Sequence, residues 1–338
     1  MNATLEVRKL TKHFAGPRAH FWSKSARIHA VDDVSFTLRP GRITALVGES
    51  GSGKSTVAQL LARLYDPTAG EIIFDGRDAT GHARRPELLR YRSRVQMIFQ
   101  DPFGSLNPVK TVEHHIMRPL LIHRLAQRQH VRAHVHELLR TVGLVPPEEF
   151  AAKYPHQLSG GQRQRVAIAR ALAVEPTVLL ADEPISMLDV SIRIGILNLM
   201  VKLKEELDIA FLYVTHDIAS ARYVADEMLV MYAGQIVEQG PTESVLQEPL
   251  HPYTRLLLSA VPDPEIGLAG KRLEARPRRR AVDLLSGCRF VDRCPLAIDV
   301  CSSVPPTLVA ARLHHSARCH VTAPATIDRE EDRVEHLH

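Results

Sequence analysis

Residues 48–56 read Gly-Glu-Ser-Gly-Ser-Gly-Lys-Ser-Thr, and this stretch is the most informative in the chain. It fits the pattern G-x-x-x-x-G-K-[ST], follows the β-branched run Ile43 to Val47, and precedes an apolar segment at helical spacing. Glycines allow consecutive backbone N–H groups to point into one concavity, and the start of the helix adds partial positive charge. The stretch therefore predicts a site for the phosphates of a nucleotide.

Within this loop, Lys54 is suited to neutralise the β- and γ-phosphates, and the small, hard hydroxyl of Ser55 is suited to bind Mg²⁺. The same loop occurs in kinases, GTPases and transport ATPases, so by itself it leaves the reaction open. We assign nucleotide contacts to Gly48, Ser50, Gly51, Gly53, Lys54, Ser55 and Thr56.

Further along the chain, the apolar stretch Val178 to Ala181 ends in Asp182 and Glu183. A buried strand can carry charge only at its end, where the strand meets solvent or metal. Asp182 suits a partner of Mg²⁺, and Glu183 suits the residue that polarises the attacking water. The two carboxylates predict a phosphoryl-transfer site at this strand end.

A second candidate site for an anion lies at Leu158-Ser159-Gly160-Gly161-Gln162, which opens an Ala- and Arg-rich helix expected over Arg163 to Ala173. Ser159 is suited to be the N-cap, and the two glycines expose the helix N-terminus to an anion. The two phosphate-binding helix ends are far apart in sequence and on different lobes, so they do not readily bind one nucleotide. We therefore expect a dimer in which the second end binds the nucleotide of the partner.

The rest of the chain alternates strands with helices, which predicts a parallel sheet covered on both faces. The segment Gly16 to His29 interrupts this pattern, and Val112 to Val142 is helical and predicts a separate lobe. A helix is also expected over Val57 to Leu64. The expected strands are Leu5–Leu10, Val34–Leu38, Ile43–Val47, Glu71–Phe74, Val95–Phe99, Val178–Ala181, Ala210–Val214 and Glu227–Met231.

Taken together, the phosphate loop, the acidic strand end and the LSGGQ segment resemble the ABC-type ATPase family over about residues 4 to 245. The resemblance implies ATP as substrate, Mg²⁺ as metal, and an α/β P-loop NTPase (RecA-like) core. It further implies an antiparallel β subdomain and an inserted helical subdomain at about residues 101–172.

Several single residues acquire roles through this resemblance alone. It implies that Gln100 binds Mg²⁺, that His216 contacts the γ-phosphate, and that Phe14 stacks on adenine, with Phe21 and Trp22 as rivals. Lys54, Glu183 and His216 are then the catalytic residues, and Ser55, Gln100 and Asp182 hold Mg²⁺. Ser159, Gly160, Gly161 and Gln162 contact the partner's nucleotide, and Ser186-Met187-Leu188-Asp189 resembles the D-loop at the dimer seam, with Met187 where the family more often has Ala.

A narrower resemblance covers nearly the whole chain. The oligopeptide/dipeptide permease family is resembled by residues 98–108 (Ile-Phe-Gln-Asp-Pro-Phe-Gly-Ser-Leu-Asn-Pro), 251–254 (His-Pro-Tyr-Thr) and 287–290 (Gly-Cys-Arg-Phe). The form Phe-Gly-Ser-Leu-Asn-Pro resembles the F-type ATPase of such pairs more than the D-type. This implies an importer of peptides, or of the nickel chelates or glutathione carried by relatives. The implied partners are a second ATPase chain, two membrane permease subunits and an external binding protein. An ATPase accessory of a carbon–phosphorus lyase complex remains an alternative.

Four cysteines, Cys288, Cys294, Cys301 and Cys319, have the spacing C-x5-C-x6-C-x17-C. In a reducing compartment such a cluster favours a metal site over disulfides. The spacing differs from that of a zinc ribbon, and four thiolates are the usual ligands of a [4Fe–4S] cluster. Iron–sulfur, zinc and no metal stay open, with a structural role expected for any metal because this segment has little core of its own.

Composition bounds the remaining possibilities. The chain has 338 residues and a net charge of +5, a small basic excess without aromatic–basic interleaving, so we expect no nucleic-acid partner. The sequence has no apolar run of about 18 residues and no apolar signal core near Met1, which predicts a cytosolic chain that does not cross a bilayer unaided. The resemblance to permease ATPases implies a peripheral position on the cytoplasmic face of the inner membrane. We expect an ATPase domain at 1–248, a Cys-containing extension at 249–322 and a disordered tail at 323–338.

Overall fold

The computed structural model describes residues 4–16, 27–81, 85–127, 129–259 and 286–322. The chain divides into two compact units, Met1–Gln235 and Ile236–His338. The division falls earlier than the predicted boundary after residue 248, which stays a prediction. Phe21, Trp22 and the predicted tail at 323–338 lie outside the described residues. No helix in the described part of the chain is long and apolar enough to cross a membrane.

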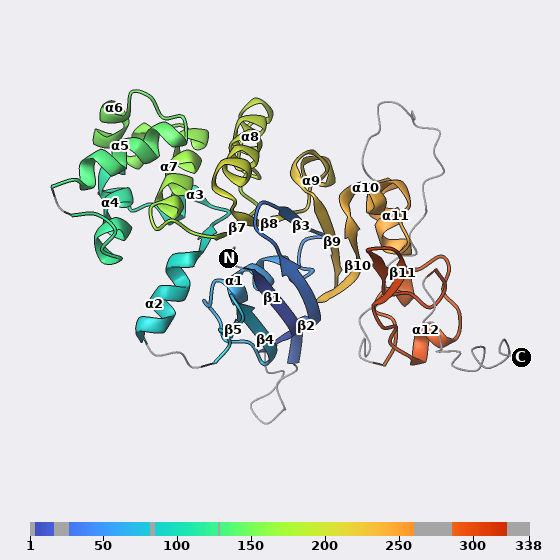
Figure 1. The fold of residues 1–338 in the computed structure, drawn as a ribbon. Coiled ribbons are helices and arrows are strands. Elements are labelled where there is room, and N and C mark those ends of the chain that lie inside the picture. The colour runs from blue at the N-terminus through green and yellow to red at the C-terminus, as the bar shows by residue number, and fades with distance from the viewer. Residues whose placement is uncertain (1–3, 17–26, 82–84, 128, 260–285, 323–338) are drawn as a thin grey trace, which may run out of the picture. The chain divides into compact units, whose positions relative to one another are not determined.

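The core of the first unit is a parallel sheet (Figure 1). Every residue of its strands β3, β7 and β8 is buried. A strand that is buried on both faces requires helices on both sides, and here α1 packs on β7 and β8 while α9 packs on β3 and β8. The strands run in the order β9 (Glu227–Tyr232), β3 (Ile43–Val47), β8 (Ala210–Thr215), β7 (Val178–Asp182) and β6 (Val95–Ile98).

An antiparallel sheet forms the second layer of this unit, in agreement with the implied β subdomain. Two strands are longer than expected: β1 begins at Leu5 but continues to Ala15, and β2 begins at Arg27 rather than at Val34. Shifts in the β1–β2 register break the simple apolar alternation, which explains why the sequence pattern missed these extensions. The sheet order is β2 (Arg27–Leu38), β1 (Leu5–Ala15), β4 (Ala69–Phe74) and β5 (Arg77–Asp78).

The helices of the first unit include the expected helical segment. The stretch predicted from Val112 to Val142 contains α4 and α5. Two helices start earlier than predicted, α1 at Lys54 and α7 at Gly160, because their first turns consist of phosphate-loop and signature residues without apolar periodicity. The helices are α1 (Lys54–Leu61), α2 (Arg85–Arg94), α3 (Pro102–Ser105), α4 (Val112–Ile122), α5 (Val131–Thr141), α6 (Pro147–Ala152), η1 (Pro155–Gln157), α7 (Gly160–Leu172), α8 (Val190–Leu207) and α9 (Ile218–Val224).

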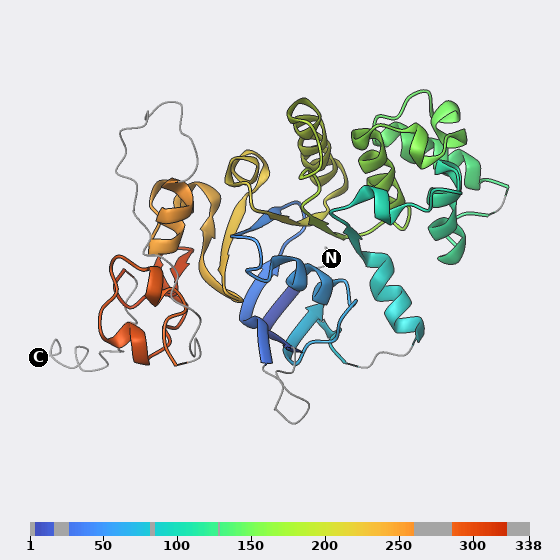
Figure 2. The same cartoon turned by 180° about the vertical axis from the view of Figure 1, so that it is seen from behind.

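The second unit, seen from both sides in Figures 1 and 2, contains short strands that the sequence pattern did not predict. Strand β12 pairs antiparallel with both β10 and β11. Two of these strands have only three or four residues, too few for an alternating pattern to stand out. The elements are β10 (Gln235–Pro241), α10 (Thr242–Gln247), α11 (Pro252–Ser259), η3 (Val291–Arg293), α12 (Val300–Ser303), β11 (Val309–Arg312) and β12 (His315–Ala317).

One buried carboxylate holds the segments of this unit together. Glu238 on β10 is fully buried and accepts hydrogen bonds from the backbone N–H groups of Leu250 and His251, both at 2.8 Å. The Nε2 atom of His315 on β12 lies 2.8 Å from the same carboxylate. Burial lowers the pKa of His251 to about 4, and its Nδ1 accepts a hydrogen bond from the N–H of Tyr253 at 3.0 Å. The His-Pro-Tyr segment and β12 are thus both fastened to β10.

We predict that Glu238→Ala destabilises the second unit by about 3–5 kcal/mol, because it leaves two backbone donors and a buried histidine without their acceptor. Hydrogen exchange of the backbone amides in residues 288–319 measures the change. The matched control is Glu243→Ala on the exposed face of α10, for which a change within about 0.5 kcal/mol is expected. Equal exchange in the two variants contradicts the anchoring role of Glu238.

Candidate active site

The phosphate loop joins β3 to α1 and depends on glycine at two positions for steric reasons. Gly48 has φ 154° and Gly53 has φ 105°, a region of backbone space that favours glycine. A Cβ atom on Gly48 would lie 2.2 Å from the carbonyl oxygen of Met231, and one on Gly53 would lie 2.1 Å from that of Ala30. The loop is therefore pressed between β9 and β2.

Lys54 begins α1 and bends back over the loop. Its Nζ donates to the carbonyl oxygens of Gly48 at 2.7 Å and Glu49 at 2.9 Å. Burial is the main influence on its pKa, which lies below the ordinary value, and the carboxylates of Glu183, Asp182 and Glu49 oppose this effect. A buried ammonium group that interacts with the carboxylates of Glu183 and Asp182 is placed to receive the negative charge of phosphate.

The two residues assigned to Mg²⁺ in the loop and on the strand end lie together. Ser55 Oγ donates to Asp182 Oδ1 at 2.9 Å, so α1 and the end of β7 meet at this point. Burial raises the pKa of Asp182, and Glu183 adds to the rise, while Ser55 and Lys54 act against it. A hydroxyl and a carboxylate oxygen in contact are the hard oxygen ligands that Mg²⁺ prefers, so these residues fit the ion.

Glu183 lies at the centre of a contact network that joins three strand ends. Gln100 Nε2, after β6, donates to Glu183 Oε2 at 2.9 Å. His216 Nδ1, after β8, lies 3.0 Å from Glu183 Oε1. Because β6, β7 and β8 are parallel neighbours, their carboxyl ends meet at one edge of the sheet. The three residues assigned to metal, water and γ-phosphate are therefore brought together.

The backbone of Glu183 has a conformation that side-chain-bearing residues rarely adopt. Its φ is 44°, and its N–H donates to the carbonyl oxygen of Val214 at 2.9 Å, which ties the residue after β7 to β8. A non-glycine residue with positive φ costs about 1–3 kcal/mol and concentrates at functional sites. This turn aims the carboxylate at Gln100 and His216 instead of along the strand.

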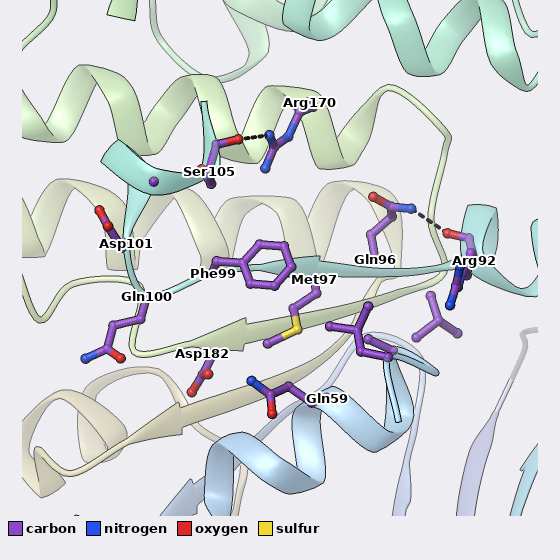
Figure 3. A pocket seen from close by; sticks show the side chains of 14 residues that line it. Gln59, Arg92, Gln96, Met97, Phe99, Gln100, Asp101, Ser105, Arg170 and Asp182 are labelled. Carbon is purple, nitrogen blue, oxygen red and sulfur yellow. Dashed lines mark hydrogen bonds between the residues drawn. The ribbon is translucent and has the colours of Figure 1, made fainter. Parts of the chain in front are cut away.

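A pocket of about 730 Å³ opens on one side of this edge (Figure 3). Asp182 and Gln100 line it, and so does Gln59 on α1, a polar residue that the sequence reasoning missed because it belongs to no motif. The far side carries Arg170, which donates to the carbonyl oxygen of Ser105 at 2.6 Å and so ties α7 to α3. The pocket is thus lined both by the residues assigned to Mg²⁺ and by residues of α3 and α7.

Phe14, assigned to adenine, lies on β1 beside a second aromatic residue. Its ring meets that of Tyr65 edge to face, with 5.6 Å between centroids, and Tyr65 is 45% exposed. Lys12 Nζ lies 5.3 Å from the Phe14 ring centroid and 5.9 Å from that of Tyr65. Tyr65 is a candidate that could not be predicted from the sequence, since only the fold brings the segment that follows α1 next to β1.

The signature segment caps α7. Ser159 Oγ accepts from the N–H of Gln162 at 3.3 Å, and Gln162 Oε1 accepts from the N–H of Ser159 at 3.0 Å. This reciprocal capping box confirms Ser159 as N-cap and gives the Gln162 side chain a second task that the sequence analysis did not foresee. Helix α7 packs on the helices α3, α4, α5 and α8 and on strand β6, whereas α1 packs on strands β7 and β8.

The glycines of the signature also have a packing role. A Cβ atom on Gly161 would lie 2.4 Å from Cγ2 of Ile192, and one on Gly160 would lie 3.2 Å from Cδ2 of Leu188. A side chain at Gly161 would therefore displace Ile192 at the start of α8, while one at Gly160 would require Leu188 to move by only a few tenths of an ångström. Next to this contact, Met187 in the predicted D-loop is 55% exposed and Val190 is 72% exposed.

The four cysteines of the second unit converge without forming a disulfide among the described residues. Cys294, Cys301 and Cys319 are buried, and the N–H of Cys288 donates to the carbonyl oxygen of Cys301 at 2.8 Å. Burial raises the pKa of Cys288 to about 11, and the other three thiols add to the rise because they lie close by.

Comparison with known proteins identifies the family to which the chain belongs. The model of the ABC transporter family matches residues 31–186, and that of the oligopeptide/dipeptide transporter C-terminal region matches residues 237–301. The oligopeptide transport ATP-binding protein OppF of Bacillus subtilis is 48% identical and covers 77% of this chain and 83% of its own length. The oligopeptide transport ATP-binding protein AppF of the same organism is 41% identical over 94% of this chain and 97% of its own.

Solved structures agree with these relatives. The dimeric ATP-binding cassette MJ0796, in a post-hydrolysis state bound to ADP and phosphate, has a TM-score of 0.62 and 32% identity over 70% of this chain and 98% of its own. CbiO1 from Clostridium perfringens, part of an ABC transporter complex, has a TM-score of 0.60 and 30% identity over 72% of this chain and 90% of its own. The predicted P-loop NTPase fold is confirmed. The chain therefore belongs to the ABC transporter family, as an ATPase of the oligopeptide/dipeptide type.

Proposed function

We propose that this chain is the ATP-hydrolysing subunit of an ABC importer for dipeptides or oligopeptides. The observation that carries the proposal is the joint placement of Gln100, Glu183 and His216 at one sheet edge, next to the Ser55–Asp182 pair. The names of OppF and AppF, both oligopeptide transport proteins, support peptides as the transported class.

Hydrolysis at this site rests on positioning and electrostatics. The loop amides and Lys54 hold the phosphates, and Glu183 polarises the attacking water. His216 lies beside Glu183 and orients the γ-phosphate. Ser55, Gln100 and Asp182 would hold Mg²⁺, which neutralises phosphate charge when bound.

We propose further that the N-terminal end of α7, with Ser159, Gly160 and Gly161, binds the nucleotide of a second ATPase chain. The separate packing of α1 and α7 supports this arrangement, as does the dimeric state of MJ0796. ATP joins the two chains because its charge is fully neutralised only when both halves close on it. Opening after hydrolysis is then the mechanical step that drives two permease subunits. An external binding protein supplies the peptide to these permeases. This chain lies peripherally on the cytoplasmic face of the membrane.

Purification from the native membrane in mild detergent tests this assembly. We expect two membrane-spanning permease proteins and a second, similar ATPase to co-purify with the chain. Co-purification of soluble enzyme subunits without any permease contradicts the importer. Recovery of two copies of this chain with the permeases contradicts the heterodimer and leaves the importer intact.

The convergence of the four cysteines supports a structural [4Fe–4S] cluster in the second unit. Cys288 interacts with the other three thiols, so all four lie in one neighbourhood. Four thiolates are the usual ligand set of that cluster, and a bound metal can stabilise a segment that has little core of its own.

Anaerobic purification with iron, sulfide and zinc analysis tests the cluster. We expect about four irons and four sulfides per chain, and their loss in Cys301→Ser. The control is Ser303→Ala, two residues along on the same short helix, which leaves the thiols intact. An iron-free protein that still hydrolyses ATP and supports transport contradicts the cluster.

A further inference from the structure

A group of two histidines and one aspartate lies on the antiparallel sheet, outside the residues assigned to ATP and Mg²⁺. His13 on β1 is the cross-strand partner of His29 on β2, and their ring centroids are 3.8 Å apart. Asp32 lies three residues further along β2. One donor atom from each of the three lies within 4.8 Å of the other two, and all three residues are half-buried.

We propose that His13, His29 and Asp32 form a binding site for a divalent transition-metal ion of borderline softness, with Zn²⁺ as the representative. Two imidazole nitrogens and one carboxylate oxygen are a ligand set that suits zinc and its neighbours, whereas Mg²⁺ prefers oxygen ligands alone. Three protein ligands with a remaining open position are also a common zinc arrangement.

The state of His13 supports this assignment. Its Nε2 atom is fully buried and has no hydrogen-bond partner in the described part of the chain. A buried ring nitrogen without a partner costs about 1–3 kcal/mol, and binding a metal ion through its lone pair removes that cost. Ligands around one zinc at about 2.1 Å lie roughly 3.4 Å apart, so small side-chain movements suffice to close the site from its present spacing.

Three contacts hold the residues of the site in place, two through backbone N–H groups and one through the carboxylate of Asp32. The N–H of His13 donates to Thr68 Oγ1 at 3.0 Å, and the N–H of Asp32 donates to the carbonyl oxygen of Gly234 at 2.8 Å. Gln235 Nε2 lies 3.5 Å from Asp32 Oδ2. A metal ion here would join β1 to β2 directly beside Phe14, whose cross-strand partner is Ile28. The site would therefore brace the strand that carries the proposed adenine contact.

Titration of the purified chain with Co²⁺, followed by visible absorption and by displacement with Zn²⁺, tests the proposal. A site of nitrogen and oxygen ligands gives a visible band without the charge-transfer absorption of thiolate ligation, which separates it from the cysteines. We expect this band in the parent protein, and at least a tenfold loss of Zn²⁺ affinity in His13→Asn/His29→Asn. The single variant Asp32→Asn replaces the carboxylate ligand and leaves both imidazole rings in place. It should also lower the affinity for Zn²⁺.

The matched control removes two histidines elsewhere. His130 and His134 are exposed and one helical turn apart at the start of α5, so His130→Asn/His134→Asn lowers the histidine count equally. An unchanged band in both His13→Asn/His29→Asn and Asp32→Asn overturns the proposal, as does loss of the band in the control alone. Circular dichroism and a cooperative thermal unfolding transition establish that each variant is folded.

Discussion

Glu183→Gln slows ATP hydrolysis by about 10²–10⁴-fold while ATP binding persists. The substitution keeps the size of the side chain and removes the charge that polarises the attacking water. The carboxylate contacts both Gln100 Nε2 and His216 Nδ1, and the amide that replaces it retains one acceptor oxygen, so the site should stay assembled. The rate of hydrolysis therefore falls far more than the affinity for ATP.

The rate of phosphate release at steady state measures the loss of hydrolysis, and equilibrium ATP binding measures the retained affinity. Gel filtration in ATP with the second ATPase chain present should show the variant trapped in a closed dimer with that chain, since the bound nucleotide is no longer removed by hydrolysis. Glu205→Gln, an exposed position near the end of α8, is the matched control and should behave as the parent protein. Turnover near the parental rate removes Glu183 from its assigned role.

Lys54→Ala weakens ATP binding by about 100-fold or more. Each hydrogen bond to a charged group contributes about 1.5–3 kcal/mol, and Lys54 is placed to make such bonds to two phosphates. The side chain is buried and already faces Asp182 and Glu183, so its loss leaves two acidic groups beside the phosphates with no cation from the loop. Repulsion then adds to the lost attraction.

Binding of a fluorescent ATP analogue measures the effect. Lys54→Met, which keeps most of the side-chain volume, should lose affinity to the same extent, because the charge rather than the packing is responsible. Lys202→Ala removes an exposed lysine that pairs with Glu206 on α8, and it should leave the affinity unchanged. Parental affinity in both Lys54 variants contradicts the assignment.

The local motifs of this chain could be recognised from the sequence because each depends on neighbours along the chain. Residues 48–56 must form a phosphate loop since their glycines, lysine and serine act through backbone that they themselves shape. Ser159 could be identified as a helix cap for the same reason, and the apolar run before Asp182 predicted a buried strand with its charge at the end.

Other features required the tertiary structure. Gln100 and His216 entered the site through resemblance alone, and their contacts with Glu183 exist because β6, β7 and β8 are adjacent. The packing of Gly161 on Ile192, the position of Tyr65 beside Phe14, and the group of His13, His29 and Asp32 were not predicted. A sequence pattern records which residues follow one another, whereas strand order, register and helix packing bring together residues far apart in the chain, and these contacts decide the chemistry of the site.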